Sequence, residues 1–181
     1  MTTNRGAYLM ARITSHGLQV DTIFGGRPEL EKMDIAAACT GLESLDYHLI
    51  MAKYCDDVRS ALDAAGELDC RMAQTSETLA NLEPQQRSAM ALFMVQDFVS
   101  PKKCRWCKGR KEVKNGGRFV ACGGCNGTGT KLPSANARAK ACGIPESTWR
   151  HKGLTAAYDR VMSGIEQAEV AALMAISKKA S

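Results

Sequence analysis

The stretch KCRWCKGRKEVKNGGRFVACGGCNGTGTK, residues 103–131, decides how the middle of this chain folds. It contains two Cys-x-x-Cys pairs, Cys104 with Cys107 and Cys122 with Cys125, separated by 14 residues. Two residues between cysteines let both sulfurs of a turn face one ion, and two such turns complete a tetrahedral site of four thiolates. The pattern therefore predicts one structural Zn2+ ion, because four thiolates leave no open position for catalysis.

Other roles for the cysteines are weaker. A redox-active thiol pair needs a βαβ context that this sequence lacks. Cys142 and His151 can also act as metal ligands, but neither has a close partner along the chain. Cys39, Cys55 and Cys70 are isolated, and we interpret them as small buried side chains.

Between the two cysteine pairs lies a signature of a tight β-turn. Asn115-Gly116 is flanked by Glu112-Val113 and Phe119-Val120. Asn-Gly between apolar residues is the strongest short signal for a two-residue hairpin. The sequence therefore predicts a zinc ribbon with a short β-hairpin.

On both sides of this ribbon the composition favours helices. Only 6% of the residues are aromatic, and Ala, Leu and Met, which are helix formers, dominate. Apolar residues at helical spacing predict helices over 34–66 (with a possible break near Gly41), 67–82 and 84–99, and helical character returns after Ser134. The expected fold is mainly α: an N-terminal helical region, an inserted zinc ribbon, then a helix-turn-helix with a long C-terminal helix.

The expected organisation has four parts. Residues 1–31 form an arm or interaction segment, 32–100 a helical region, 101–132 the zinc ribbon and 133–181 the helix-turn-helix region. No secretory signal is evident at the N-terminus and no apolar stretch reaches 18 residues, so we expect neither secretion nor a membrane span.

Charge is distributed very unevenly. Residues 101–152 hold 13 Lys and Arg but 2 acidic residues, whereas the rest holds 11 basic and 17 acidic residues. Such a basic block indicates a polyanionic partner, and nucleic acid is the favoured one. A solvated surface without a partner is the alternative.

After the ribbon, the sequence is typical of a helical corner. Ser134 can cap a helix, Gly143 suits the left-handed position that ends it, and Ile144-Pro145 forms the turn. A second helix is expected from Pro145 or Ser147 through Trp149 toward Val161. A small residue at Ala139 and an apolar one at Trp149 let two helices meet, as in a DNA-binding helix-turn-helix. A plain helical corner is the alternative.

The second helix of this corner would face double-stranded DNA. We expect Arg150 to touch a base edge, and Arg138 and Lys140 to hold phosphates. The full set of candidate DNA-binding residues is Arg138, Lys140, Glu146, Ser147, Thr148, Arg150, His151 and Lys152.

These motifs together resemble a known family. Cys-Arg-x-Cys-x-Gly at 104–109, Cys-Gly-x-Cys-x-Gly-x-Gly at 122–129, Pro-Ser-Ala at 133–135, Thr148-Trp149 and Tyr158-Asp159 look like the late-gene antitermination protein Q of lambda-like phages. The resemblance covers about residues 103–161, roughly a third of the chain. The first hundred residues match only in length and helical character.

The resemblance implies a function in the cytoplasm of a bacterial host. Q-type proteins bind a DNA element in the phage late promoter and engage RNA polymerase that has paused with sigma attached. They contact the sigma subunit and the flap of the β subunit, and polymerase then reads through pauses and terminators. The four cysteines would be the zinc ligands and the 147–152 segment the DNA-reading helix. The resemblance marks no polymerase-contacting residues, but the acidic helical region at 32–100 suits a protein surface and is the expected polymerase contact.

Two other functions remain open. The chain can be a zinc-stapled repressor or activator that needs only DNA. The Cys-x-x-Cys-x-Gly-x-Gly repeat also looks like the zinc region of DnaJ-type chaperones, although those carry four repeats for two ions. An enzyme is not expected, because paired carboxylates, an activated nucleophile and a phosphate-binding loop are not evident.

Overall fold

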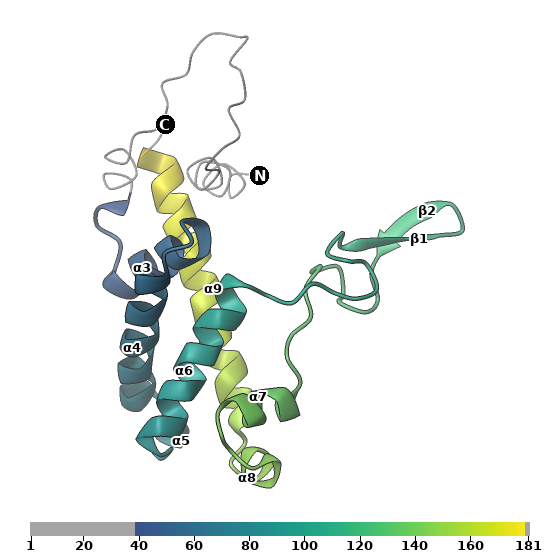
Figure 1. Cartoon of the computed structure of the whole chain (residues 1–181). Helices are drawn as coiled ribbons and strands as arrows, with labels where there is room; N and C mark the ends of the chain where they lie inside the picture. Colours follow the sequence, from purple (N-terminus) through teal and green to yellow (C-terminus); the bar gives the residue numbers. More distant parts are fainter. Residues whose placement is uncertain (1–38, 180–181) are drawn as a thin grey trace.

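The computed structural model describes residues 39–179, so the arm expected at 1–31 lies outside the described residues. An elongated bundle of helices forms the body of the molecule, and a small two-stranded module extends from its side (Figure 1). This arrangement confirms the expected fold class, which is mainly α with an inserted hairpin and a long C-terminal helix.

The first two helices of the described chain are α3 and α4. Helix α3 spans Ser44–Tyr54 and follows the break expected near Gly41, whose φ is +81°. Helix α4 spans Val58–Thr75, and the carboxylate of Asp57 caps it by accepting a hydrogen bond from Arg59 N. The expected stop at Gly66 is therefore wrong. Gly66 lies inside α4, where packing of neighbours such as Leu68 outweighs the modest helix penalty of glycine.

Two further helices complete the first part of the body. The helix expected over 67–82 is interrupted at Ser76, which starts the short helix α5 (Glu77–Ala80). Helix α6 spans Pro84–Val99 with proline in its first turn, as predicted, and it ends before Ser100-Pro101.

The segment after the ribbon forms helix α7 (Ala135–Ala141), helix α8 (Glu146–His151) and helix α9 (Leu154–Lys179). The expectation that the second helix continues toward Val161 is wrong, because Gly153 has a φ of +62° and separates α8 from α9. The corner therefore has a very short second helix, and the long C-terminal helix starts in a new direction.

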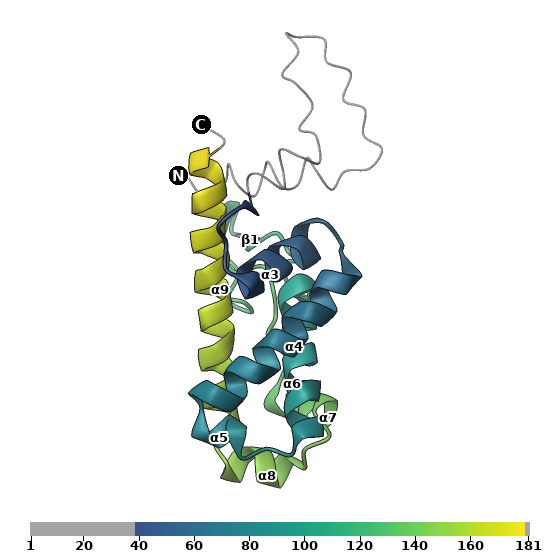
Figure 2. The same ribbon diagram turned by 90° about the vertical axis from the view of Figure 1, so that its left-hand side faces the viewer.

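One hydrophobic core joins the helices on both sides of the ribbon. It includes Leu49, Met72 and Met94 from α3, α4 and α6 together with Trp149 and Tyr158 from α8 and α9. Helix α9 runs along the length of the body beside α3 and α6, with α8 at the end of the bundle (Figure 2). The 32–100 and 133–181 regions thus depend on each other for burial, and the ribbon is an insertion between them. Within residues 39–179, no helix is long and apolar enough to cross a membrane.

Candidate metal centre and nucleic-acid interface

The four cysteines of the two pairs come together at one point of the ribbon. All four sulfur atoms lie within 4.8 Å of one another. Cys104 Sγ lies 3.9 Å from Cys122 Sγ, and Cys107 Sγ lies 3.7 Å from Cys125 Sγ. A tetrahedral ion with bonds of about 2.3 Å to sulfur separates its ligands by roughly 3.8 Å. The sulfurs are therefore spaced as ligands of a single metal ion.

One backbone group favours the thiolate form of Cys125 that metal binding needs, whereas burial raises the pKa of Cys122. Gly129 N donates a hydrogen bond of 3.2 Å to Cys125 Sγ. Burial opposes ionisation of this thiol, but the Gly129 hydrogen bond and the neighbouring sulfurs lower the pKa of Cys125 to about 6. Gly129 has a φ of +81°, and a Cβ there would lie 2.8 Å from Gly109 O, so only glycine fits this close approach.

The hairpin and the base of the ribbon are joined by backbone hydrogen bonds. Strands β1 (Glu112–Asn115) and β2 (Arg118–Ala121) are antiparallel, and Asn115 pairs with Arg118. The hairpin is confirmed, but its turn is Gly116-Gly117 rather than Asn115-Gly116. Both glycines have positive φ, as a type I′ turn requires. At the base, Lys131 N donates to Lys102 O, which closes the module.

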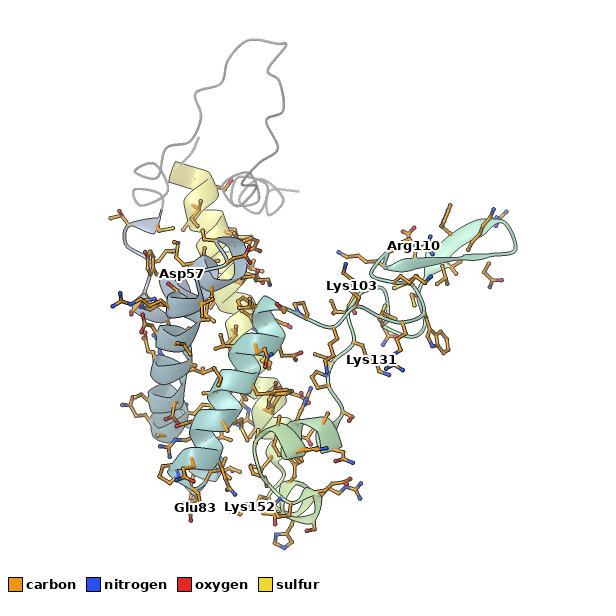
Figure 3. The ribbon with its side chains drawn as sticks, viewed as in Figure 1. Asp57, Glu83, Lys103, Arg110, Lys131 and Lys152 are labelled. Carbon is orange, nitrogen blue, oxygen red and sulfur yellow. The ribbon has the colours of Figure 1, made fainter. Side chains whose placement is uncertain are left out.

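The surface of the ribbon is strongly basic. Residues 101–132 contain one acidic residue, Glu112, and nine exposed basic residues: Lys102, Lys103, Arg105, Lys108, Arg110, Lys111, Lys114, Arg118 and Lys131. Lys103 and Lys131 lie where the ribbon joins the body, and Arg110 lies farther out, toward the hairpin (Figure 3). Within the part of the chain that the structure describes, no ion pair neutralises these nine side chains.

The turn of the helical corner has the cap and the glycine that its sequence predicts, although its second helix is shorter than expected. Ser134 Oγ accepts from Ala137 N and caps α7. At the other end, Ile144 N donates to Ala139 O (2.9 Å) and Gly143 N donates to Lys140 O (3.2 Å). This pair of bonds, with Gly143 at a φ of +65°, is a Schellman motif. Ala139 and Trp149 are buried where the two helices meet.

Most of the candidate DNA-binding residues lie on the outer side of this corner. Lys140, Ser147, Arg150, His151 and Lys152 are exposed, and Glu146 and Thr148 are half-buried. Arg150 forms an ion pair with Glu146 one turn earlier in α8. Such an exposed pair contributes little to stability, so it leaves the guanidinium free to change partners.

Arg138 is the exception, and the expectation that it holds a phosphate is wrong. Its side chain is 4% exposed, and its Nη1 donates to Asp159 Oδ1 at 2.7 Å. The guanidinium also lies over the Tyr158 ring, 4.2 Å from the centroid. Arg138 therefore connects α7 to α9 inside the body. The buried carboxyl of Asp97 on α6 lies nearby; burial raises its pKa, although the charge of Arg138 lowers it.

The remaining cysteines stay apart from the cluster. Cys142 is buried in the helical core, which raises the pKa of its thiol to about 11. Cys39 is buried, as expected, but Cys70 is exposed because it lies on the outer face of α4. Neither Cys142 nor His151 belongs to the group of metal-ligating side chains.

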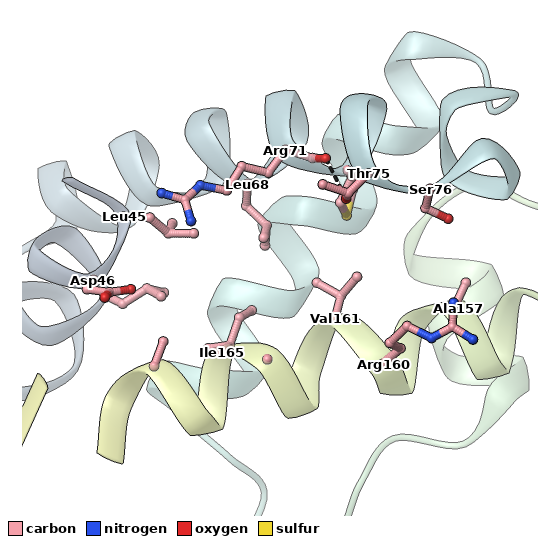
Figure 4. A pocket seen from close by; sticks show the side chains of 14 residues that line it. Leu45, Asp46, Leu68, Arg71, Thr75, Ser76, Ala157, Arg160, Val161 and Ile165 are labelled. Carbon is pink, nitrogen blue, oxygen red and sulfur yellow. Dashed lines mark hydrogen bonds between the residues drawn. The ribbon is translucent and has the colours of Figure 1, made fainter. Parts of the chain in front are cut away.

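A cavity of about 350 Å³ lies between α3, α4 and α9. Its lining is mostly aliphatic, with Leu45, Leu68 and Val161 directed into it and the polar side chains of Asp46 and Arg71 beside them (Figure 4). Arg71 is bound to Glu43 and Glu67. The aliphatic residues of this lining belong to the core-facing sides of the helices, and we assign no chemistry to the cavity.

Two exposed aromatic side chains of the ribbon were not predicted as functional. Trp106 is 75% exposed and Phe119 is 71% exposed. The signal for Trp106 was its place between two metal ligands, since a knuckle turn has no interior large enough to bury an indole.

Comparison with protein families, curated proteins and solved structures finds no match to this chain.

Proposed function

We propose that the chain is a zinc-stapled, DNA-binding transcription factor of the antitermination type. The observation that carries the proposal is that one chain combines a four-sulfur cluster, which we infer binds zinc, with a helical corner whose second helix exposes cations. A structural zinc site orders the ribbon, and the corner presents α8 toward a DNA groove.

The choice of zinc follows from the ligands. Four thiolates in a tetrahedral arrangement suit Zn2+ better than Mg2+ or Ca2+, which prefer oxygen. A single ion on four sulfurs has no open position, so its role is to hold the fold. Elemental analysis of purified protein should find one zinc per chain.

Double-stranded DNA is the proposed ligand of the corner. Ser147, Arg150 and Lys152 are exposed on or beside α8, and Lys140 is exposed on α7. Arg and Lys can read guanine or clamp phosphate, and Ser can bond either a base or a phosphate. Arg138 is no longer part of this surface; it positions α7 against α9 instead.

Antitermination rests on the resemblance of residues 103–161 to Q-type proteins and on the division of charge. The basic ribbon and corner suit DNA, while the more acidic helical body suits a protein surface such as RNA polymerase. The sigma subunit and the β flap are the polymerase elements that the resemblance implies, and a phage late promoter in a bacterial host is the expected setting.

Run-off transcription tests this proposal directly. Purified polymerase is given a template with the phage late promoter and a downstream terminator. We expect the protein to increase read-through. Unchanged read-through, with DNA binding intact, would instead support the second candidate, a zinc-stapled repressor or activator that acts through DNA alone. Loss of both activities would favour a DnaJ-like interaction module.

Two substitutions distinguish base contacts from phosphate contacts at the corner. Arg150→Ala should lose about 1–3 kcal/mol of discrimination at one base position. Lys140→Ala should weaken binding to all sequences and reduce the slope of log affinity against log salt by about one unit. Equal loss on specific and random DNA for Arg150→Ala would make Arg150 a phosphate contact.

A further inference from the structure

The ribbon carries exposed aromatic side chains that the proposed function does not use. Residues 101–132 contain nine exposed basic side chains and one acidic side chain. Trp106 is 75% exposed, whereas the other tryptophan of the chain, Trp149, is fully buried. A large exposed aromatic side chain among basic side chains is uncommon on a protein surface that has no binding partner.

Trp106 is exposed but held in place. A Cβ atom on Gly124 would lie 3.0 Å from Cδ2 of the indole and 3.1 Å from Cγ, so the ring rests against the backbone of the second cysteine turn. Cys104 and Cys107, on either side of the tryptophan, are buried in the sulfur cluster. The ring is therefore ordered before any partner arrives, which reduces the entropy lost on binding.

The hairpin adds a second aromatic side chain of the same kind. Phe119 pairs with Lys114 across the two strands, and both are exposed. The neighbouring pair is Val113 with Val120, and Val113 packs against the cysteine cluster. Because successive residues of a strand point to opposite faces, Phe119 and Lys114 lie on the face directed away from the cluster.

Aromatic rings among cations match one class of ligand. Unpaired bases stack on exposed rings, while lysine and arginine neutralise the backbone phosphates. A duplex offers phosphates but hides the faces of its bases within the stack. The charge complementarity thus points to nucleic acid, and the exposed ring points to a single strand.

We propose that the ribbon binds single-stranded nucleic acid, with a base stacked on Trp106 and phosphates held by the surrounding lysine and arginine side chains. The site lies on a different element from α8 and does not depend on the duplex-binding function proposed above. DNA and RNA share the chemistry that this surface recognises, namely a base with an open face and a phosphate backbone.

The two tryptophans make a direct test possible with the full-length, zinc-loaded protein. Oligo(dT), oligo(U) and a blunt duplex hairpin are titrated at one fixed salt concentration. Stacking should quench the emission of exposed Trp106 in a saturable way, while buried Trp149, whose Nε1 donates to Thr155 Oγ1, stays silent. Quenching by oligo(dT) alone or oligo(U) alone identifies the preferred strand, and stronger quenching by the hairpin contradicts the proposal.

Substitutions give a second readout that does not use emission. In anisotropy measurements with a labelled oligonucleotide, Trp106→Ala should weaken single-strand binding about 5- to 140-fold. Trp106→Phe should retain much of the affinity because it keeps a ring. Leu132→Ala, which removes a 59% exposed aliphatic side chain of the same module, is the matched control and should bind normally.

Two results would overturn the inference. Equal single-strand affinity for the wild type and Trp106→Ala, without quenching, would exclude stacking. If Trp106→Ala binds single strands normally but reduces read-through of the terminator, Trp106 contacts a protein instead. Arg150→Ala should leave single-strand binding unchanged, so failure of the duplex-binding proposal can be recognised separately.

Discussion

The helical body and the ribbon bury different kinds of side chains. The body buries leucine, methionine and aromatic side chains from helices on both sides of the ribbon. In the ribbon, the buried side chains are Cys104, Cys107 and Cys122, with Val113 and Cys125 packed against them. A two-stranded hairpin is at best marginally stable by itself. The comparison indicates that hydrophobic burial supports the body, and that the ribbon needs another source of stability, which the proposed metal ion would supply.

Metal removal should have the largest effect, and the effect should fall on the ribbon rather than on the body. Structural zinc sites contribute about 10 kcal/mol or more to folding, and the ribbon has little else to replace that energy. We expect a chelator to unfold residues 101–132 while the helices of the body persist. DNA binding should be abolished, because the exposed basic side chains of the ribbon add their phosphate contacts to those of the corner. Hydrogen exchange read peptide by peptide would show the loss of protection confined to the ribbon.

A cysteine outside the cluster provides the control for that experiment. Cys122→Ser should release the metal and unfold the ribbon, whereas Cys70→Ser changes an exposed side chain of α4 and should do neither. An apo protein with unchanged ribbon protection and unchanged DNA affinity would contradict the metal-dependent account.

Substitution of the two tryptophans should distinguish the body from the ribbon by a smaller change in unfolding free energy than metal removal does. Trp149 is 0% exposed and packs 6.2 Å from the Tyr158 ring, centroid to centroid, so Trp149→Ala should cost about 3–5 kcal/mol of unfolding free energy. Trp106→Ala removes a side chain that lies mostly in solvent and should change the stability of the body by less than about 0.5 kcal/mol. Urea unfolding followed by far-ultraviolet circular dichroism measures both, and similar losses for the two variants would refute the contrast.

Two glycines of the body give smaller expected effects than Trp149, with opposite signs. Gly66 is exposed inside α4, and a Cβ there meets nothing within 4 Å, so Gly66→Ala should stabilise by about 0.5–1 kcal/mol. Gly143 also has open space, but its φ is +65°, so Gly143→Ala should destabilise by about 1–2 kcal/mol. Thermal unfolding of the two variants checks the signs. A stabilising Gly143→Ala would mean that the α7 terminus is not held in the left-handed conformation.

The sequence predicted the four-cysteine cluster and the fold class correctly, but not all of the helix boundaries. The cysteine spacing predicted the cluster, since four ligands on two turns depend on local geometry alone. The capping serine of α7 and the glycine that ends it were also predicted, because caps act over a few residues. Helix boundaries at Gly66 and near Val161 were wrong, since burial of distant partners decides whether a glycine stays inside a helix or ends it.

The sequence by itself determined the two cysteine turns of the cluster, the hairpin and the sharp corner after it, because each depends on side chains within a few positions of one another. Only the tertiary structure decided that Arg138 points inward to Asp159 and Tyr158, and that Trp106 faces solvent while Trp149 is buried. Those outcomes depend on which helices meet and how much interior each module has, and contacts between residues far apart in the chain settle both.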